Sequence, residues 1–298
     1  MLCKKPFIRG IIPYGCGQCM PCRINRGRLW QHRILLESLL HGDSTFLTLT
    51  YDDENLPTSI DNSTGMLDFT LDPEDLTKFW KKLRSKIYPR KVRYYSVGEY
   101  GDESGRPHYH ASVFGVSHHE QEVFESCWTK GFVYAGDVTF ESAAYVARYV
   151  TKKMTSFDDC RLRGRYPEFA RQSNRPGIGA EAIPKLADAL TSEFGHLAMT
   201  DDVPGTISYG MKSFPLGRYL KNKLRDAMYE EDTKKQRKKR EEYWKKKHAQ
   251  EMRGVLEEAR KNKKIKGKEI RDIYLDIDQG RRDSLEVKYN IYRSRGKL

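Results

Sequence analysis

Two histidines separated by a single residue stand in the segment RPHYHASVFG, residues 106–115. Successive side chains of a strand point to opposite faces, so His108 and His110 share one face if this segment is a strand. Two imidazoles at that spacing can hold one metal ion, and Glu99, at the end of the preceding predicted strand, offers a carboxylate beside them. Such a three-ligand set leaves coordination positions open and suits Mg²⁺, Mn²⁺ or Zn²⁺.

The third ligand of this site has rivals in the sequence. Asp102 and Glu103 follow Glu99 in the predicted turn, and Glu99 has an alternative role in an ion pair with Arg93 or Arg106. A shift of one residue along the strand would also turn Glu99 to the other face. A lone H-x-H spacing is common among ordinary histidines, so the choice of ligands depends on the strand register.

Two tyrosines lie four residues apart in YVARYVTKK, residues 145–153. On a helix, Tyr145 and Tyr149 share one face, and Lys152 and Lys153 follow within about one turn of Tyr149. A tyrosine hydroxyl can attack phosphorus to form a phosphotyrosine ester, although a pKa of about 10 makes it a weak nucleophile unaided. A metal ion on the phosphate and a lysine that favours phenolate supply the activation. The alternative is an ordinary packing face of aromatic side chains.

Four cysteines form a third cluster near the N-terminus. Cys16, Cys19 and Cys22 have the spacing C-x₂-C-x₂-C, and Cys3 offers a fourth thiol. Four thiolates suit a tetrahedral structural Zn²⁺ ion, with an iron–sulfur cluster or free buried thiols as alternatives. Six cysteines in 298 residues indicate reduced thiols rather than a disulfide framework.

Hydropathy patterns predict the elements that must position these residues. Four segments have the pattern of strands: 45–53, 92–100, 108–115 and 132–138. Four have the apolar spacing of helices: 23–41, 71–88, 119–129 and 141–154. A turn at 101–107 makes the second and third strands an antiparallel hairpin, whereas 55–65 is expected to be a loop. The pattern predicts an α+β fold, an antiparallel sheet with helices on one face.

The helix expected over 71–88 has a marked start. Asp72 is a candidate N-cap, Pro73 suits the first helical position, and Asp75 is placed to close a capping box. These three residues together predict where the helix begins.

Charge and composition bound the class of protein. The chain carries 54 Lys and Arg against 41 Asp and Glu, a net charge of +13, which favours nucleic acid as a partner. Residues 218–270 hold 20 basic and 10 acidic residues, so most of the excess lies there. We find no signal peptide and no apolar run near the roughly 20 residues of a membrane span, so we expect no membrane partner.

The chain is expected to have three regions. Residues 1–25 form the cysteine cluster and candidate zinc site, 26–217 the α+β domain, and 218–298 a basic, largely helical extension whose last segment, 285–298, is a strand candidate. Neither a polymerase motif nor a P-loop is found.

The order of a strand motif, a histidine pair and a tyrosine motif resembles that of the HUH endonucleases. A closer resemblance, over roughly residues 1–220, is to the replication initiators of gokushovirus-type microviruses, which are small single-stranded DNA phages. It is carried by the segments CGQCMPCRINRGRLWQHR, FLTLTYDDENLP, GEYGDESGRPHYHASVFG, YVARYVTKK and RPGIG.

This resemblance implies the HUH endonuclease fold over 26–217, with the histidine strand central. It implies His108 and His110 as ligands of Mg²⁺ or Mn²⁺, and Tyr145 and Tyr149 as alternating nucleophiles. Arg148 stands where a lysine is the more usual partner of the first tyrosine.

The function implied is initiation of rolling-circle DNA replication. The enzyme would nick single-stranded origin DNA, form a 5′-phosphotyrosine and a free 3′-OH, and later join the strand into a circle. Expected partners are the host helicase and polymerase in the cytoplasm of the bacterial host. The alternatives are a plasmid relaxase or transposase of the same chemistry, and a non-catalytic, zinc-stabilised nucleic-acid-binding protein.

Overall fold

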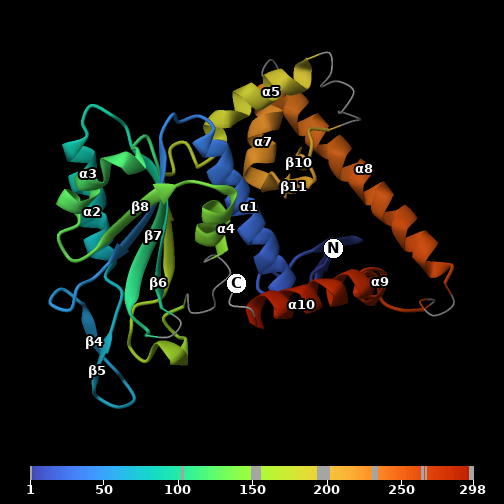
Figure 1. Ribbon diagram of the computed structural model, residues 1–298. Helices are drawn as coiled ribbons and strands as arrows, with labels where there is room; N and C mark the ends of the chain where they lie inside the picture. Colours follow the sequence, from blue (N-terminus) through green and yellow to red (C-terminus); the bar gives the residue numbers. More distant parts are fainter. Residues whose placement is uncertain are drawn as a thin grey trace. The chain divides into compact units, whose positions relative to one another are not determined.

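The structure of the chain is a computed structural model. It describes residues 2–101, 104–148, 156–192, 202–229, 234–262, 265 and 267–294 (Figure 1). The chain divides into two compact units. The first, here called the sheet unit, comprises residues 27–189 and 205–224, and the second, the helical unit, comprises 1–26, 190–204 and 225–298.

The sheet unit is built on five strands in the order β8-β3-β7-β6-β9, and every neighbouring pair is antiparallel. Their bounds are β3 (Ser44–Thr50), β6 (Arg93–Tyr100), β7 (Pro107–Phe114), β8 (Val133–Asp137) and β9 (Phe169–Gln172). The predicted antiparallel α+β fold is confirmed. The predicted hairpin forms its centre, so β7, which carries the histidine pair, is flanked on both sides.

Helices cover both faces of this sheet, so the prediction of a single covered face was wrong. Helices α2 (Pro73–Lys86) and α3 (Gln121–Cys127) lie on one face, and α1 (Met20–Ser38) and α4 (Phe140–Arg148) on the other (Figure 1). The first face is filled by residues such as Leu49, Tyr109, Phe79 and Phe124. The second is filled by Val97, Phe114, Ile34 and Val146. The reason is that β6 and β7 bury side chains of both alternating sets, which requires cover on each side.

Helix α2 begins as the sequence predicts, with one exception. Asp72 accepts a hydrogen bond from the backbone N–H two residues on at 2.8 Å, and Pro73 is the first helical residue. Asp75 closes no capping box. Its carboxylate instead accepts from the Tyr51 hydroxyl at 3.2 Å and pairs with Lys130 at 3.1 Å, because it points into the buried side of the helix.

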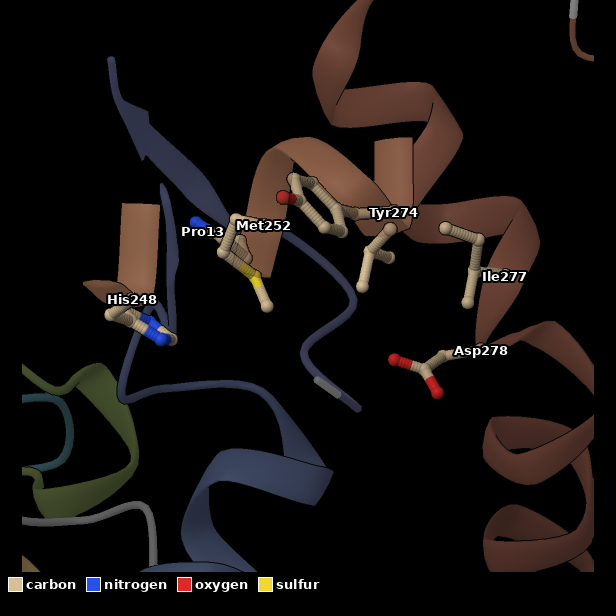
Figure 2. Close-up of a pocket in the computed structure, with 7 residues that line it drawn as sticks. Pro13, His248, Met252, Tyr274, Ile277 and Asp278 are labelled. Carbon is tan, nitrogen blue, oxygen red and sulfur yellow. The ribbon is translucent and has the colours of Figure 1, made fainter. Parts of the chain in front are cut away.

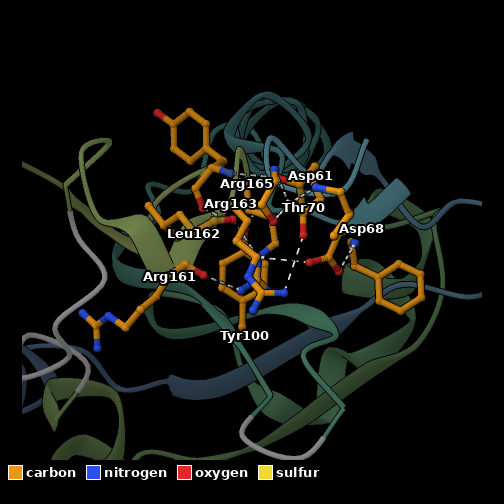
Figure 3. Close-up of polar contacts among 12 residues, drawn as sticks. Asp61, Asp68, Thr70, Tyr100, Arg161, Leu162, Arg163 and Arg165 are labelled. Atoms are coloured by element: carbon orange, nitrogen blue, oxygen red, sulfur yellow. Dashed lines mark hydrogen bonds and ion pairs between the residues drawn. The ribbon is translucent and has the colours of Figure 1, made fainter. Parts of the chain in front are cut away.

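A small hairpin occupies the stretch predicted as a loop. Strands β4 (Thr58–Ile60) and β5 (Leu67–Phe69) pair antiparallel. The segment around residues 161–166 holds this hairpin through the ion pairs Arg163–Asp61 and Arg165–Asp68, 3.6 and 3.5 Å (Figure 3). The short strands were missed because these contacts are distant in sequence.

Tyr100, the last residue of β6, fixes the base of that hairpin. Its hydroxyl donates to the Tyr166 carbonyl at 2.7 Å and accepts from the Leu71 N–H at 3.1 Å. Tyr100 and Glu99 are neighbours in one strand, so their side chains leave it on opposite faces.

The remaining elements complete the two units. They are α5 (Ile183–Thr191), β10 (Thr206–Tyr209), β11 (Lys212–Pro215) and α7 (Gly217–Met228). The helical unit also contains β1 (Phe7–Arg9), β2 (Ile12–Tyr14), α8 (Lys234–Arg260), α9 (Ile270–Ile277) and α10 (Gln279–Ser294). Its core gathers around Leu256, Ile273 and Tyr274. Among the helices described, none is long and apolar enough to cross a bilayer.

The strand suggested for 285–298 is wrong as far as residue 294, because α10 covers that part. An alternating pattern forms a strand only when a partner strand satisfies its backbone groups, whereas a helix satisfies them internally.

Candidate active site

The register of β6 and β7 brings the three predicted metal ligands together. Glu99 lies opposite His108, and Val97 lies opposite His110. Residues opposite each other share a face, so Oε1 of Glu99 lies 2.7 Å from Nε2 of His108 and 3.2 Å from Nε2 of His110. The Glu99 side chain is only 3% exposed. The three ligand atoms therefore meet in a largely buried position.

The other side of each imidazole is held by β7 or β3. Nδ1 of His108 lies 3.0 Å from the Arg106 carbonyl, which only accepts, so this nitrogen carries the hydrogen. Nδ1 of His110 lies 2.9 Å from the Thr48 hydroxyl. Histidines that bind metals are commonly held in this way, with one ring nitrogen bonded to the protein and the other left for the ion.

The donor set fits a divalent cation. Nε2 of His108 keeps a lone pair that faces Oε1 of Glu99 at 2.7 Å, so a positive charge, a proton or a cation, must lie between them. All three ligand atoms lie within 4.8 Å of one another. Ligands bonded to one ion at 2.0–2.2 Å lie about 3 Å apart at right angles, close to the spacing found here.

The rival partners of Glu99 are engaged elsewhere. Arg93 pairs with the buried Glu37, and Arg106 pairs with Asp53 at 2.7 Å. Asp102 and Glu103 lie outside the described residues. Among the residues described, Glu99 is the carboxylate that meets both imidazoles.

Helix α4 aims Tyr145 at this cluster. Val146 and its neighbours Ala143 and Ala147 face the core, which leaves Tyr145 on the site side. The Tyr145 ring stands edge-on to His110, with centroids 5.0 Å apart and an interplanar angle of 88°. The guanidinium carbon of Arg148 lies 5.4 Å from the Tyr145 ring centroid. Tyr149, Lys152 and Lys153, which complete the tyrosine motif, lie outside the described residues.

Two residues of β3 belong to the site and were not singled out from sequence. Phe46 stacks on His110 with centroids 5.7 Å apart and 13° between the planes, and it meets the Tyr145 ring edge-on at 6.0 Å. Thr48 bonds to His110, as described above. The signal was present, because Phe46 and Thr48 occupy the same alternate set of the predicted strand, but nothing local tied that set to the histidines.

The four N-terminal cysteines also meet in the helical unit. The sulfurs of Cys3, Cys16, Cys19 and Cys22 all lie within 4.8 Å of one another, and those of Cys3 and Cys19 are 3.7 Å apart. Thiolates bonded to one Zn²⁺ at about 2.3 Å lie about 3.8 Å apart in a tetrahedron. All six cysteines of the chain are free thiols.

Backbone amides stabilise negative charge on these sulfurs. The N–H groups of Lys4, Lys5, Cys16 and Cys19 donate to cluster sulfurs at 3.2–3.4 Å. Burial raises the pKa of the Cys16 thiol, but N–H groups of Cys19 and Gln18 outweigh it and lower the pKa to about 6. Burial raises the pKa of Cys22 to about 12. The set therefore combines one readily formed thiolate with thiols that need a cation to lose their protons.

Comparison with known proteins gives the class of the chain. Residues 44–154, which include β3, β6, β7 and α4, match the family of the replication-associated protein ORF2. The replication-associated protein ORF2 of Spiroplasma virus 4 is 30% identical over 260 residues, which cover 79% of this chain and 76% of that protein.

Two further relatives are phage replication-associated proteins. VP4 of Bdellovibrio phage phiMH2K is 32% identical over 209 residues, 65% of this chain and 64% of that protein. ORF4 of Chlamydia phage 1 is 30% identical over 163 residues, 47% of this chain and 38% of that protein. No solved structure matches the chain. The chain belongs to the microvirus-type family of phage replication-associated proteins.

Proposed function

We propose that this protein initiates rolling-circle replication by nicking single-stranded origin DNA with a tyrosine, in the presence of Mg²⁺ or Mn²⁺. The observation that carries the proposal is the position of Tyr145, edge-on to His110 at 5.0 Å, beside the cluster of Glu99, His108 and His110. Membership of a replication-associated family supports DNA as the substrate.

In this proposal, Glu99 and the two imidazoles hold the ion. The ion would polarise the scissile phosphate and stabilise charge on the departing 3′ oxygen. The Tyr145 hydroxyl loses its proton and its oxygen attacks phosphorus. The bond from phosphorus to the 3′ oxygen breaks, and that oxygen takes up a proton. One phosphodiester is exchanged for one phosphotyrosine ester, so a later attack by a 3′-OH can reverse the step and close a circle.

Arg148 takes the activating part that the family pattern assigns to lysine. A guanidinium near the Tyr145 ring favours the phenolate over the phenol, and it remains charged at any working pH. Tyr149 would serve as the second nucleophile, and Lys152 and Lys153 would contact its phosphate. We assign the nuclease to the predicted 26–217 region.

The four cysteines would hold a structural Zn²⁺ in the predicted 1–25 region. Their tetrahedral spacing and the N–H donors to their sulfurs support this assignment. The basic 218–298 region would add sequence-independent affinity for DNA.

The nick leaves a free 3′ end, so the proposal requires a polymerase to extend it and a helicase to open the strand ahead. Both would come from the host, in the cytoplasm of the infected bacterium.

The decisive experiment traps the covalent product. Labelled single-stranded circular phage DNA is incubated with protein and Mn²⁺ and run on a denaturing gel. We expect label to move with the wild-type protein and to be lost in His108→Ala and in the double variant Tyr145→Phe/Tyr149→Phe. Tyr134→Phe is the matched control, because Tyr134 also meets Phe46 edge-on, at 6.4 Å, and should leave the adduct intact.

Each other outcome points to a specific alternative. An adduct that persists in the double variant excludes these nucleophiles. DNA binding without any adduct, with Mg²⁺ or Mn²⁺, favours the non-catalytic, zinc-stabilised binding protein. Nicking of plasmid transfer origins or transposon ends, but not of phage DNA, favours the relaxase or transposase.

A further inference from the structure

The N-terminal hairpin β1–β2 exposes an aromatic pair that the proposed nuclease does not use. Phe7 and Tyr14 are directly opposite in the pairing, and their rings stack with centroids 5.3 Å apart and 17° between planes. Phe7 is 47% and Tyr14 41% exposed. The guanidinium carbon of Arg9 lies 5.9 and 6.0 Å from the two ring centroids. We call these three residues the hairpin platform.

The opposite face of the hairpin explains why the platform is held outward. Ile8 and Ile11 pack against the core of the helical unit, and the Tyr274 hydroxyl donates to the Ile11 carbonyl at 2.9 Å. Pro13 lines a pocket together with Met252 and Tyr274 (Figure 2). The hairpin therefore already has a buried apolar face, and the second set of large side chains is not needed for folding.

Both ends of the hairpin are constrained as well. Cys3 precedes β1 and Cys16 follows β2, and both belong to the cysteine cluster. Gly10, with φ of +62°, takes the first position of the two-residue turn, a conformation that type II′ turns assign to glycine. A stacking surface held on so short and fixed a frame loses little conformational entropy when it binds a ligand.

The charge around the platform selects the kind of ligand. Lys5 and Arg9 are exposed on the hairpin. In the same unit, α8 exposes six lysines in its first half: Lys234, Lys235, Lys238, Lys239, Lys245 and Lys246. Flat apolar rings beside a guanidinium, on a basic unit, suit a polyanion that also presents flat rings. Single-stranded nucleic acid has that chemistry, because its bases are unpaired and each has a face for stacking.

We infer that Phe7, Arg9 and Tyr14 bind single-stranded DNA outside the nicking site, with bases extending the Phe7–Tyr14 stack and Arg9 beside a phosphate. The inference rests on the proposed function only in taking DNA as the ligand. It assigns to the hairpin a hold on the strand that is independent of metal ions at the histidines.

The test measures binding of a fluorescent thymidine homo-oligonucleotide by anisotropy. No Mg²⁺ or Mn²⁺ is added, so that nicking does not occur, and no chelator is used, so that any zinc stays bound. Phe7→Ala/Tyr14→Ala should bind at least about ten-fold more weakly than wild type, since it removes stacking of one or more bases. Phe7→Tyr/Tyr14→Phe should bind as wild type. Tyr88→Ala is the matched control, because Tyr88 is 83% exposed and lies outside the hairpin.

A second ligand separates stacking from charge. An abasic oligonucleotide of equal length should bind wild type and Phe7→Ala/Tyr14→Ala alike. Equal weakening on both oligonucleotides, or unchanged binding of the thymidine strand, overturns the inference. In the second case the exposed pair becomes a candidate protein contact. Circular dichroism and zinc content of the variant show whether the hairpin is still folded.

Photocrosslinking with 5-bromodeoxyuridine gives a direct readout. Adducts should map to the peptide that contains Phe7 or Tyr14, and their absence there contradicts the inference. Failure of the proposed nuclease would be seen separately, as absence of a covalent adduct in the gel experiment, and would leave these binding results standing.

Discussion

At the scale of single residues, the metal site depends on a neighbour that binds no metal. The Thr48 hydroxyl, on β3, lies 2.9 Å from Nδ1 of His110 and fixes the orientation of that ring. Phe46 holds the same ring from one side by stacking. Glu99 could be predicted from sequence because a tight turn fixes the hairpin register. Thr48 and Phe46 could not, since the pairing of β3 with β7 joins residues 62 positions apart.

Thr48→Val should weaken metal use without unfolding the protein. The change keeps the shape of the side chain but removes the hydroxyl, so His110 is free to turn. We expect the Mn²⁺ concentration for half-maximal nicking to rise about 10- to 100-fold. Thr48→Ser should behave as wild type. Thr50→Val, on the same face of β3, is the matched control, and an equal effect there would contradict the role of Thr48.

At the scale of elements, packing between distant segments decided what local patterns could not. The strands and the start of α2 were predicted because their signals are periodic or sit within one turn. Hairpin β4–β5 and helix α10 were missed because their conformation depends on distant contacts in the first case and on the lack of a partner strand in the second. Cover on both faces was missed because the predicted helices carry no mark of the face they choose.

Helix α1 shows such a distant contact in His32, which is fully buried. Nδ1 of His32 donates to the Pro215 carbonyl at 2.9 Å, so Nε2 accepts from the Tyr209 hydroxyl at 3.1 Å and the ring is neutral. Burial lowers the pKa of His32 from its ordinary value. Below the unfolded pKa of about 6.5, the unfolded chain therefore binds more protons than the folded one.

It follows that His32 contributes full stability above pH of about 6.5, and that this contribution is lost as the pH falls toward the lower folded value. We expect the midpoint of thermal unfolding to drop between pH of about 7.5 and about 5.5. The drop should be smaller in His32→Gln, which cannot titrate. Equal drops in the two proteins would mean that other groups cause the pH dependence.

At the scale of the whole molecule, the two ends of the chain fold together in the helical unit. The Tyr274 hydroxyl reaches the Ile11 carbonyl across 263 positions of sequence, and Lys4 pairs with Glu286 at 2.8 Å. The cysteine cluster encloses the same hairpin. Loss of a bound metal there should therefore loosen the C-terminal helices as well as the N-terminus.

Cys16→Ser/Cys19→Ser tests this link. The wild type should contain one zinc per chain by elemental analysis, and the variant should contain none. Amide hydrogen exchange should rise in β1, β2 and α9 but not in β6 and β7. Cys160→Ser is the matched control, because Cys160 is exposed and lies outside the cluster. A variant with no zinc and unchanged exchange in α9 would show that the hairpin holds without the metal.

The adjacency of Glu99 and Tyr100 limits how this family can change length. One residue serves the histidines and the next holds the base of hairpin β4–β5, on opposite faces of a single strand. A one-residue insertion or deletion on the turn side of Glu99 in β6 would exchange the two faces and remove both contacts at once. The turn after Gly101 carries no such coupling. Insertions tolerated by natural relatives should therefore collect in that turn and be absent from the strand.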